Sequence, residues 1–171
     1  MPDITVDLAR NDADYDAARG LCREWRDWHW AAFPKDGPRD GNPLDPVTFQ
    51  AVIDDLPRIH ARPRGAIVLA KVDGTAMGCV MYHELTPDVA EIKRLFVRPG
   101  GQGLGLGRLL LERMFASMRQ DGYRNVHFSS ARFLTHARRL YESVGFHDIP
   151  HPDGFPDTLR GFVYFMERSL D

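Results

Sequence analysis

The sequence predicts a mixed α/β fold in which helices cover both faces of a central, mostly antiparallel sheet. The chain has 171 residues, of which 43% are hydrophobic and 27% are charged, as expected for one globular domain over residues 1–171. Its middle part contains apolar runs separated by short turns, whereas segments before and after it show helical spacing. The predicted element order is β-α-α-β-β-β-α-β-α-β-β.

The N-terminal part of the chain carries a strand and two helices. Residues 4–8 alternate apolar and polar side chains, which predicts the first strand. Asn11, a good helix cap, precedes a segment with helical spacing to about residue 32. Residues 33–46 are rich in Pro, Gly, Asp and Asn and predict a loop. The Asp-Pro pair at 45–46 then predicts a second helix to about residue 56.

Three consecutive antiparallel strands follow, at residues 66–72, 75–85 and 89–97. The first two are joined by Asp73-Gly74, which is the strongest short signal for a hairpin. A Thr-Pro-Asp turn at 86–88 joins the second to the third.

The last part of the chain alternates helices and strands. A glycine-rich turn precedes a helix at residues 104–118, followed by a strand at 125–130 and a helix at 135–144. Short strands are predicted at 146–149 and, after a Pro-rich loop, at 161–166.

Composition argues against several functional classes. With 22 basic and 24 acidic residues, the net charge of −2 disfavours a nucleic-acid-binding protein. The longest apolar runs, such as residues 66–70, are far too short to span a membrane, and the N-terminus lacks an apolar signal segment. Cys22 and Cys79 show no CxxC spacing, so we expect reduced thiols and a cytoplasmic protein. His127 and His136 show no metal-ligand spacing, and no metal is predicted.

The sharpest functional signal is the segment from Arg98 to Arg108, which reads RPGGQGLGLGR. It follows a predicted strand and opens a predicted helix, where unpaired amides and the positive end of the helix dipole attract anions. Glycine lets those amides approach a phosphate without a Cβ in the way. The spacing fits neither a Walker A loop, because Leu106 stands where lysine is needed, nor the GxGxxG dinucleotide fingerprint. A phosphorylated ligand of another kind is expected.

Two motifs resemble those of the GCN5-related N-acetyltransferase (GNAT) superfamily. Gln102-x-x-Gly105-x-Gly107 matches its Gln/Arg-x-x-Gly-x-Gly/Ala pattern, directly after a segment, residues 91–99, that looks like its central strand. Residues 137–146 resemble its second signature, a helix ending in Leu-Tyr-x-x-x-Gly-Phe. The predicted element order agrees with that family over most of the chain.

The resemblance implies the GNAT, or acyl-CoA N-acyltransferase, fold and acetyl-CoA as cosubstrate. The backbone of Leu95, Phe96 and Val97 would pair with the pantetheine arm as an added strand. Ser130 either bonds a cofactor amide or is an ordinary strand residue. The glycine-rich turn would hold the pyrophosphate. The residues assigned to it are Gln102, Gly103, Leu104, Gly105, Leu106, Gly107 and Arg108.

The sequence also departs from the family pattern. Leu134 stands where many members have an asparagine that contacts the pantetheine arm. Arg132, Arg138 and Arg139 either reach the 3′-phosphate or form a solvated helix face.

Tyr141 and Glu91 are the candidate catalytic residues. A tyrosine keeps its proton at neutral pH and can donate it to a departing thiolate, and Tyr141 matches the tyrosine that the family points at the cofactor sulfur. Glu91 matches a glutamate common in the family and is the candidate base, acting through water; an ion-paired or solvated acid is an equally compatible interpretation. His83 and Glu84 are weaker substitutes.

The facing of Glu91 depends on the regularity of its strand. Strict alternation places Glu91 on one face with Leu95 and Val97, and a bulge would reverse this. A backbone amide near Phe96 would stabilise the oxyanion.

We therefore expect an enzyme that moves an acetyl group from acetyl-CoA to a primary amine of a small molecule or peptide, by direct attack in a ternary complex. The alternative is a non-catalytic, acyl-CoA-binding regulatory module. A homodimer is an expectation from the family. Residues 33–46 and 150–160, together with the first two helices, would form the acceptor wall. Acidic loop residues hint at a cationic acceptor: Asp36, Asp40, Asp153 and Asp157.

Overall fold

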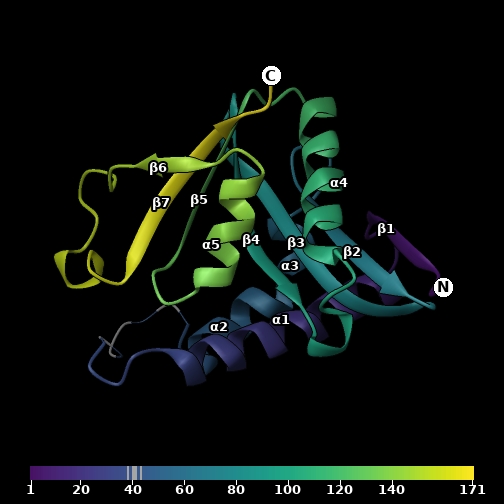
Figure 1. Ribbon diagram of the computed structural model, residues 1–171, viewed down its shortest axis with the longest axis horizontal. Helices are drawn as coiled ribbons and strands as arrows, with labels where there is room; N and C mark the ends of the chain where they lie inside the picture. The colour runs from purple at the N-terminus through teal and green to yellow at the C-terminus, as the bar shows by residue number, and fades with distance from the viewer. Residues whose placement is uncertain (38, 40–41, 43) are drawn as a thin grey trace.

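The computed structural model describes residues 1–37, 39, 42 and 44–171 (Figure 1), so the loop acid Asp40 lies outside the described residues. In these residues the chain forms one seven-stranded sheet of order β1-β2-β3-β4-β5-β7-β6. Neighbouring strands are antiparallel except β4 and β5, which are parallel. The predicted fold class is confirmed. The strands are β1 (Ile4–Leu8), β2 (Ala66–Val72), β3 (Thr75–Thr86), β4 (Val89–Val97), β5 (Asn125–Ala131), β6 (His147–Ile149) and β7 (Val163–Ser169).

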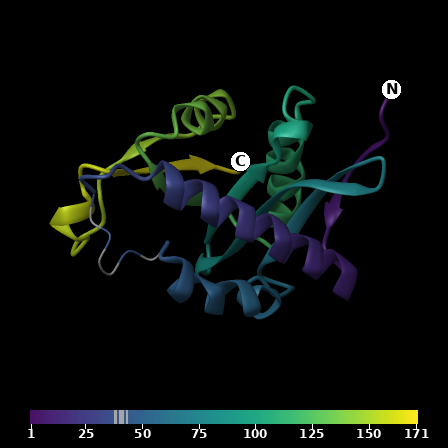
Figure 2. The ribbon, with the colours of Figure 1, turned by 90° about the horizontal axis from the view of Figure 1, so that it is seen from below.

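Helices cover both faces of the sheet, with α1 and α2 on one side and α4 and α5 on the other (Figure 2). As predicted, Asn11 caps the first helix, where its side chain accepts a hydrogen bond from the amide of Asp14. None of the described helices is long and apolar enough to cross a membrane. The helices are α1 (Asp12–Ala32), α2 (Pro46–Asp54), α3 (Leu56–Ile59), α4 (Leu106–Gln120) and α5 (Thr135–Ser143). Short 3-10 turns cover Pro99–Gly101 and Asp157–Leu159.

Several predicted boundaries differ from the structure by one to three residues. The second helix ends at Asp54, and α3 is a separate turn. The helix after the glycine-rich turn starts at Leu106 because Gly105 has a φ of 72°, which an α-helix does not include. The last strand extends to Ser169, because its polar end still pairs with the start of β5 at Asn125.

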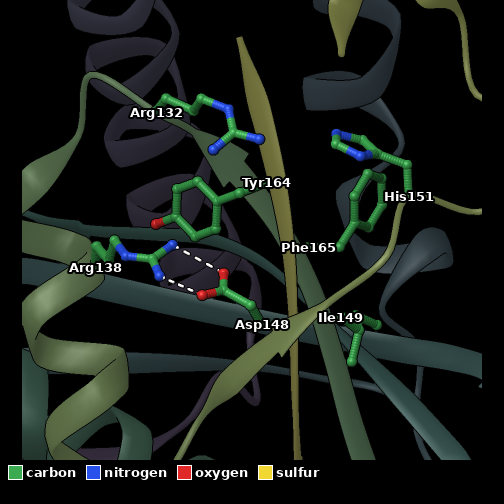
Figure 3. Close-up of a pocket in the computed structure, with 7 residues that line it drawn as sticks. All are labelled: Arg132, Arg138, Asp148, Ile149, His151, Tyr164 and Phe165. Carbon is green, nitrogen blue, oxygen red and sulfur yellow. Dashed lines mark hydrogen bonds and ion pairs between the residues drawn. The ribbon is translucent and has the colours of Figure 1, made fainter. Parts of the chain in front are cut away.

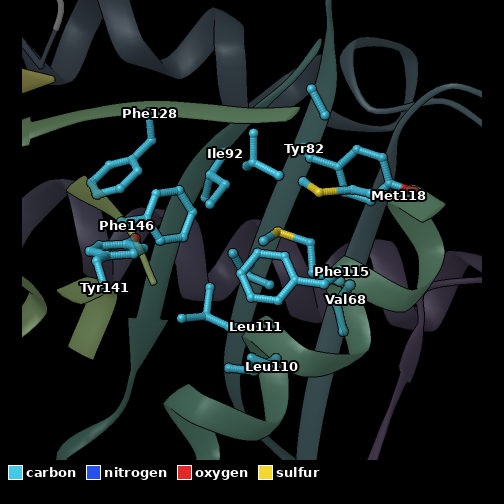
Figure 4. Close-up of a cluster of buried hydrophobic side chains, with 14 of the residues drawn as sticks. Val68, Tyr82, Ile92, Leu110, Leu111, Phe115, Met118, Phe128, Tyr141 and Phe146 are labelled. Atoms are coloured by element: carbon cyan, nitrogen blue, oxygen red, sulfur yellow. The ribbon is translucent and has the colours of Figure 1, made fainter. Parts of the chain in front are cut away.

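Two apolar clusters hold the helices on the sheet. The larger cluster lies between the sheet and the α4–α5 layer (Figure 4). The smaller cluster lies on the opposite face, under α1, α2 and α3, and includes both cysteines, which are free and buried. Fully buried members of the larger cluster include Tyr82, Leu110, Leu111, Met114 and Met118. Those of the smaller cluster include Leu21, Cys22, Ile53, Cys79 and Met81.

The central strand β4 separates from β5 soon after it begins. The two strands pair only at Val89, Ala90 and Glu91, whereas β4 pairs with β3 as far as Val97. From Ile92 onward, no strand among the described residues pairs with this edge of β4. An open strand edge carries unpaired amides and carbonyls, so an extended ligand can bind along it.

A β-bulge at Arg94 and Leu95 reverses the alternation of side chains along β4. One residue of β3 lies opposite these two residues, and Arg94 has a φ of 56°. Leu95 and Val97 therefore pack against the larger cluster, to which Ile92 belongs. The prediction from strict alternation, that Leu95 and Val97 share a face with Glu91, is wrong because of this bulge.

Candidate functional site

The turn between β4 and α4 presents a run of unpaired backbone amides. The amide of Gln102 donates to the carbonyl oxygen of Pro99. This amide is therefore not free to bind a ligand, contrary to the prediction from the sequence. The amide of Leu109 donates to the carbonyl oxygen of Gly105. In the part of the chain that the structure describes, no protein oxygen accepts a hydrogen bond from the amides of residues 103–108. These amides and the N-terminal end of α4 form a suitable site for an anion.

The glycines of this turn serve two purposes. Gly103 and Gly105 have φ values of 83° and 72°, and a Cβ on either one would meet no atom within 4 Å. Glycine is needed there for the backbone conformation and not for space. Gly107 is needed for space, because a Cβ there would lie 2.9 Å from Cδ2 of Leu140. Glycine at this position allows the first turn of α4 to approach α5.

Tyr141 lies on α5 and is 5% exposed. Its ring centroid lies 3.9 Å from that of Phe128 on β5 and 5.5 Å from that of Phe146 (Figure 4). Burial raises the pKa of Tyr141, and the nearby phenol of Tyr164 raises it further. The hydroxyl of Tyr141 is therefore protonated at neutral pH, as a proton donor must be.

Glu91 lies on the other face of the sheet, where β4 and β5 begin to separate. Its Oε1 is 2.6 Å from Nζ of Lys93 and 3.3 Å from Nε2 of His83. Burial alone would raise the pKa of Glu91, but the hydrogen bond from His83 and the attraction of Lys93 outweigh it and lower the pKa to about 2. The carboxylate is ionised at neutral pH and is a weak proton acceptor.

The remaining predicted residues fall at the expected places along the sheet. Leu95, Phe96 and Val97 lie on the segment of β4 that has left β5. Ser130 lies on β5 beyond His127, the last residue paired with β4. Glu84 forms a long ion pair with Arg64, in which Oε2 of Glu84 lies 3.4 Å from Nε of Arg64.

A hollow of about 410 Å³ lies between α5 and the β6–β7 pair (Figure 3). Arg138 points into it and is held by Asp148 and Glu142 at 2.5 and 2.9 Å. Leu140 packs toward α4 at Gly107, so the hollow lies on the other side of α5 from the glycine-rich turn. Of the arginines considered for the 3′-phosphate, Arg138 is thus engaged elsewhere.

Arg94 and His60 belong to neither sequence motif, but they meet in the structure. Nη1 of Arg94 lies 2.8 Å from Nε2 of His60, on the face of Glu91. The one signal in the sequence was the pair of basic residues, Lys93 and Arg94, inside the central strand. Among the described residues, no group of three or more His, Cys, Asp or Glu side chains is arranged to hold a metal ion.

Comparisons with known proteins agree with this geometry. The model of the Acetyltransferase (GNAT) family matches residues 22–146. An uncharacterized N-acetyltransferase of Schizosaccharomyces pombe is 39% identical over 105 residues; the alignment covers 58% of this chain and 64% of that relative, so the chain spans just under two thirds of its length.

Solved structures share the fold over nearly the whole chain. A GNAT-family acetyltransferase of Staphylococcus aureus has a TM-score of 0.74 at 18% identity, covering 99% of this chain and 100% of the other. The protein yncA of Salmonella typhimurium, solved with its cofactor acetyl-CoA, has a TM-score of 0.67 at 21% identity, covering 98% of this chain and 94% of the other.

Proposed function

This chain belongs to the GNAT acetyltransferase family, and from that premise we propose that it transfers the acetyl group of acetyl-CoA to a primary amine of a small molecule or peptide. The observation that carries the proposal is the run of free amides from Gly103 to Arg108, directly beyond the open edge of β4. Phosphate oxygens satisfy such amides, and an extended pantetheine arm satisfies a strand edge.

The binding residues follow from this arrangement. The amides of residues 103–108 would hold the pyrophosphate, assisted by the dipole of α4. The backbone of Leu95, Phe96 and Val97 would pair with the pantetheine amides, with Ser130 on the facing strand as a further polar contact. When bound, acetyl-CoA supplies an acetyl group already activated as a thioester.

Tyr141 is proposed as the proton donor. In the transfer, the C–N bond forms and the C–S bond breaks. The amine nitrogen gives up one proton to a base, and the departing sulfur takes another from an acid. The buried, protonated hydroxyl of Tyr141 suits the role of that acid. A backbone amide near Phe96 would stabilise the negative oxygen of the acetyl carbonyl during attack.

The proton acceptor is proposed to be Glu91 or its partner His83. Glu91 is ionised but weakly basic, because Lys93 stabilises its charge. His83 contacts the same carboxylate, and imidazole is the side-chain type suited to proton transfer near neutral pH. Glu91 would then orient the ring of His83 and act through it.

Direct attack by the amine is favoured over an acyl-enzyme. Cys22 and Cys79 are both 0% exposed, beneath α1 and the sheet. A thiol that no substrate reaches does not serve as a nucleophile. We therefore expect ternary-complex kinetics; ping-pong kinetics with an acetylated cysteine would contradict the proposal.

The deciding experiment is the release of free thiol from acetyl-CoA in the presence of a panel of amines, namely amino acids, polyamines, aminoglycosides and peptide N-termini. Acetylated product with at least one of them supports the enzyme. Tight CoA binding that changes affinity for another protein, with no thiol released, would instead support the regulatory module.

A further inference from the structure

Arg94 occupies an unusual position in the central strand. It forms the bulge of β4, and its φ of 56° lies in the left-handed region that residues with a Cβ rarely adopt. Such strain persists where the surrounding structure enforces it, and it is concentrated at functional sites. The bulge lies on the segment of β4 that has left β5, on the face of α1 and α2.

The neighbours of the Arg94 guanidinium are neutral. Nη1 donates to Nε2 of His60 at 2.8 Å, and the guanidinium carbon lies 5.4 Å from the ring centroid of Phe49. Nδ1 of His60 donates to the carbonyl oxygen of Tyr82 at 2.9 Å. Burial lowers the pKa of His60 to about 3, so this ring is a neutral acceptor fixed in one tautomer. Arg94 therefore has its position fixed without having its charge balanced.

No described carboxylate lies within ion-pair distance of Arg94. The nearest acid along the strand, Glu91, attracts Arg94 electrostatically, but its carboxylate is held by Lys93 and His83. Arg94 and Lys93 against Glu91 leave one excess positive charge in this cluster. A largely desolvated cation is costly unless an anion pairs with it. In the described part of the chain, Nε and Nη2 of Arg94 have no hydrogen-bond acceptor, so one edge of the guanidinium is unused.

We propose that the free edge of Arg94 binds the carboxylate of the acceptor, so that the acceptors are amino acids or other amines that carry a carboxylate. The inference rests on the proposed acetyltransferase function and names its substrate class. Two parallel N–H groups match the two oxygens of a carboxylate.

The position of Arg94 relative to the candidate base supports this assignment. The ring of His60, which bonds Arg94, has its centroid 5.8 Å from that of His83, which contacts Glu91. An amino acid carries its amine and carboxylate on one carbon. A carboxylate on Arg94 therefore keeps the amine close to the groups that would take its proton.

The test compares each of the common L-amino acids with its carboxamide and its decarboxylated amine, following thiol release from acetyl-CoA. We expect kcat/KM for the best amino acid to exceed that for both analogues by about 10²-fold, as for a charge-assisted bidentate contact. Arg94→Met should lower kcat/KM for the amino acid about 10²-fold more than for the carboxamide, and so remove the preference. Both residues carry a Cβ, so the backbone strain at position 94 stays the same. Arg94→Lys, which keeps the charge and loses the fork, should retain only part of the preference.

Arg124→Met is the matched control, because Arg124 is exposed and its side chain has no partner among the described residues. This variant should leave kcat/KM for every acceptor unchanged. An equal loss for amino acid and carboxamide in Arg94→Met would make Arg94 a structural residue and overturn the inference. Preference of the wild type for amines without a carboxylate would also overturn it and leave the proposed function intact. No thiol release with any amine would overturn both.

Discussion

Ile92 and Leu95 lie on the same face of β4. They are three residues apart, so regular alternation would place them on opposite faces, but the bulge at Arg94 adds one residue to the strand. Both side chains contact the larger cluster beneath α4 and α5. The bulge therefore shifts the alternation of side chains by one residue between the two halves of β4. Glu91 and Arg94 lie on the face of α1 and α2, whereas Leu95 and Val97 pack against the larger cluster on the other face.

Replacing Tyr141 tests the proton donor. Tyr141→Phe removes only the hydroxyl from a ring packed on Phe128 and Phe146, so the fold should be retained. We expect turnover to fall by about 10²-fold or more, with the Kd for CoA unchanged, since general acid catalysis commonly contributes this much. Steady-state kinetics and calorimetry measure the two quantities. Tyr164→Phe, a second buried phenol, is the control and should keep its turnover.

Two glycines allow ligand binding to be separated from stability. Gly105 and Gly122 have φ values of 72° and 90°, and a Cβ on either would meet no atom within 4 Å. Substitution by alanine should cost each variant about 1 kcal/mol of unfolding free energy from backbone strain. Only Gly105→Ala, at the N-terminus of α4, should weaken CoA binding, by about tenfold. Equal affinity of the two variants for CoA would contradict the proposal that this turn binds the pyrophosphate.

The pH dependence of kcat/KM distinguishes Glu91 from His83. With its pKa lowered to about 2, Glu91 stays ionised over the whole working range, so a mechanism based on it alone shows no loss of activity between pH 8 and pH 5. A loss over that range indicates an imidazole. His83→Gln should then remove most of the activity, and Glu91→Gln should remove less of it, because it removes only the partner of the ring.

Two buried histidines predict destabilisation by acid. Burial lowers the pKa of His29 to about 4 and that of His60 to about 3, whereas an unfolded histidine titrates near 6.5. Below about pH 6.5 the unfolded chain takes up protons that the folded chain does not. Stability is therefore fully present above that pH and falls as the pH drops toward the folded values. At pH 5 each histidine should cost about 2 kcal/mol relative to pH 7.

Urea unfolding at the two pH values measures this loss. His29→Asn should reduce the difference between pH 7 and pH 5 by about half, whatever its effect on stability at pH 7. A difference unchanged in that variant would show that other groups cause the acid sensitivity.

Local chemistry predicted most of the fold. The cap at Asn11, the Asp73-Gly74 hairpin and the glycine-rich turn each depend on residues within a few positions of one another, so they can be read from the chain. The same holds for the two motifs that resemble the GNAT family, and the family match over residues 22–146 confirms that identification. The roles of Tyr141 and Glu91 stay predictions.

The order of the elements apart from α3, the family and the place of the glycine-rich turn could be predicted from the chain alone, because these signals are short-range. The point where β4 leaves β5, the face that each side chain of β4 takes and the partners of Glu91 and Arg94 are set by contacts across the folded sheet. The bulge depends on pairing with β3, and the contact between Arg94 and His60 joins positions far apart in the chain. Register and long-range charge pairing arise from packing the whole sheet, and no local pattern encodes them.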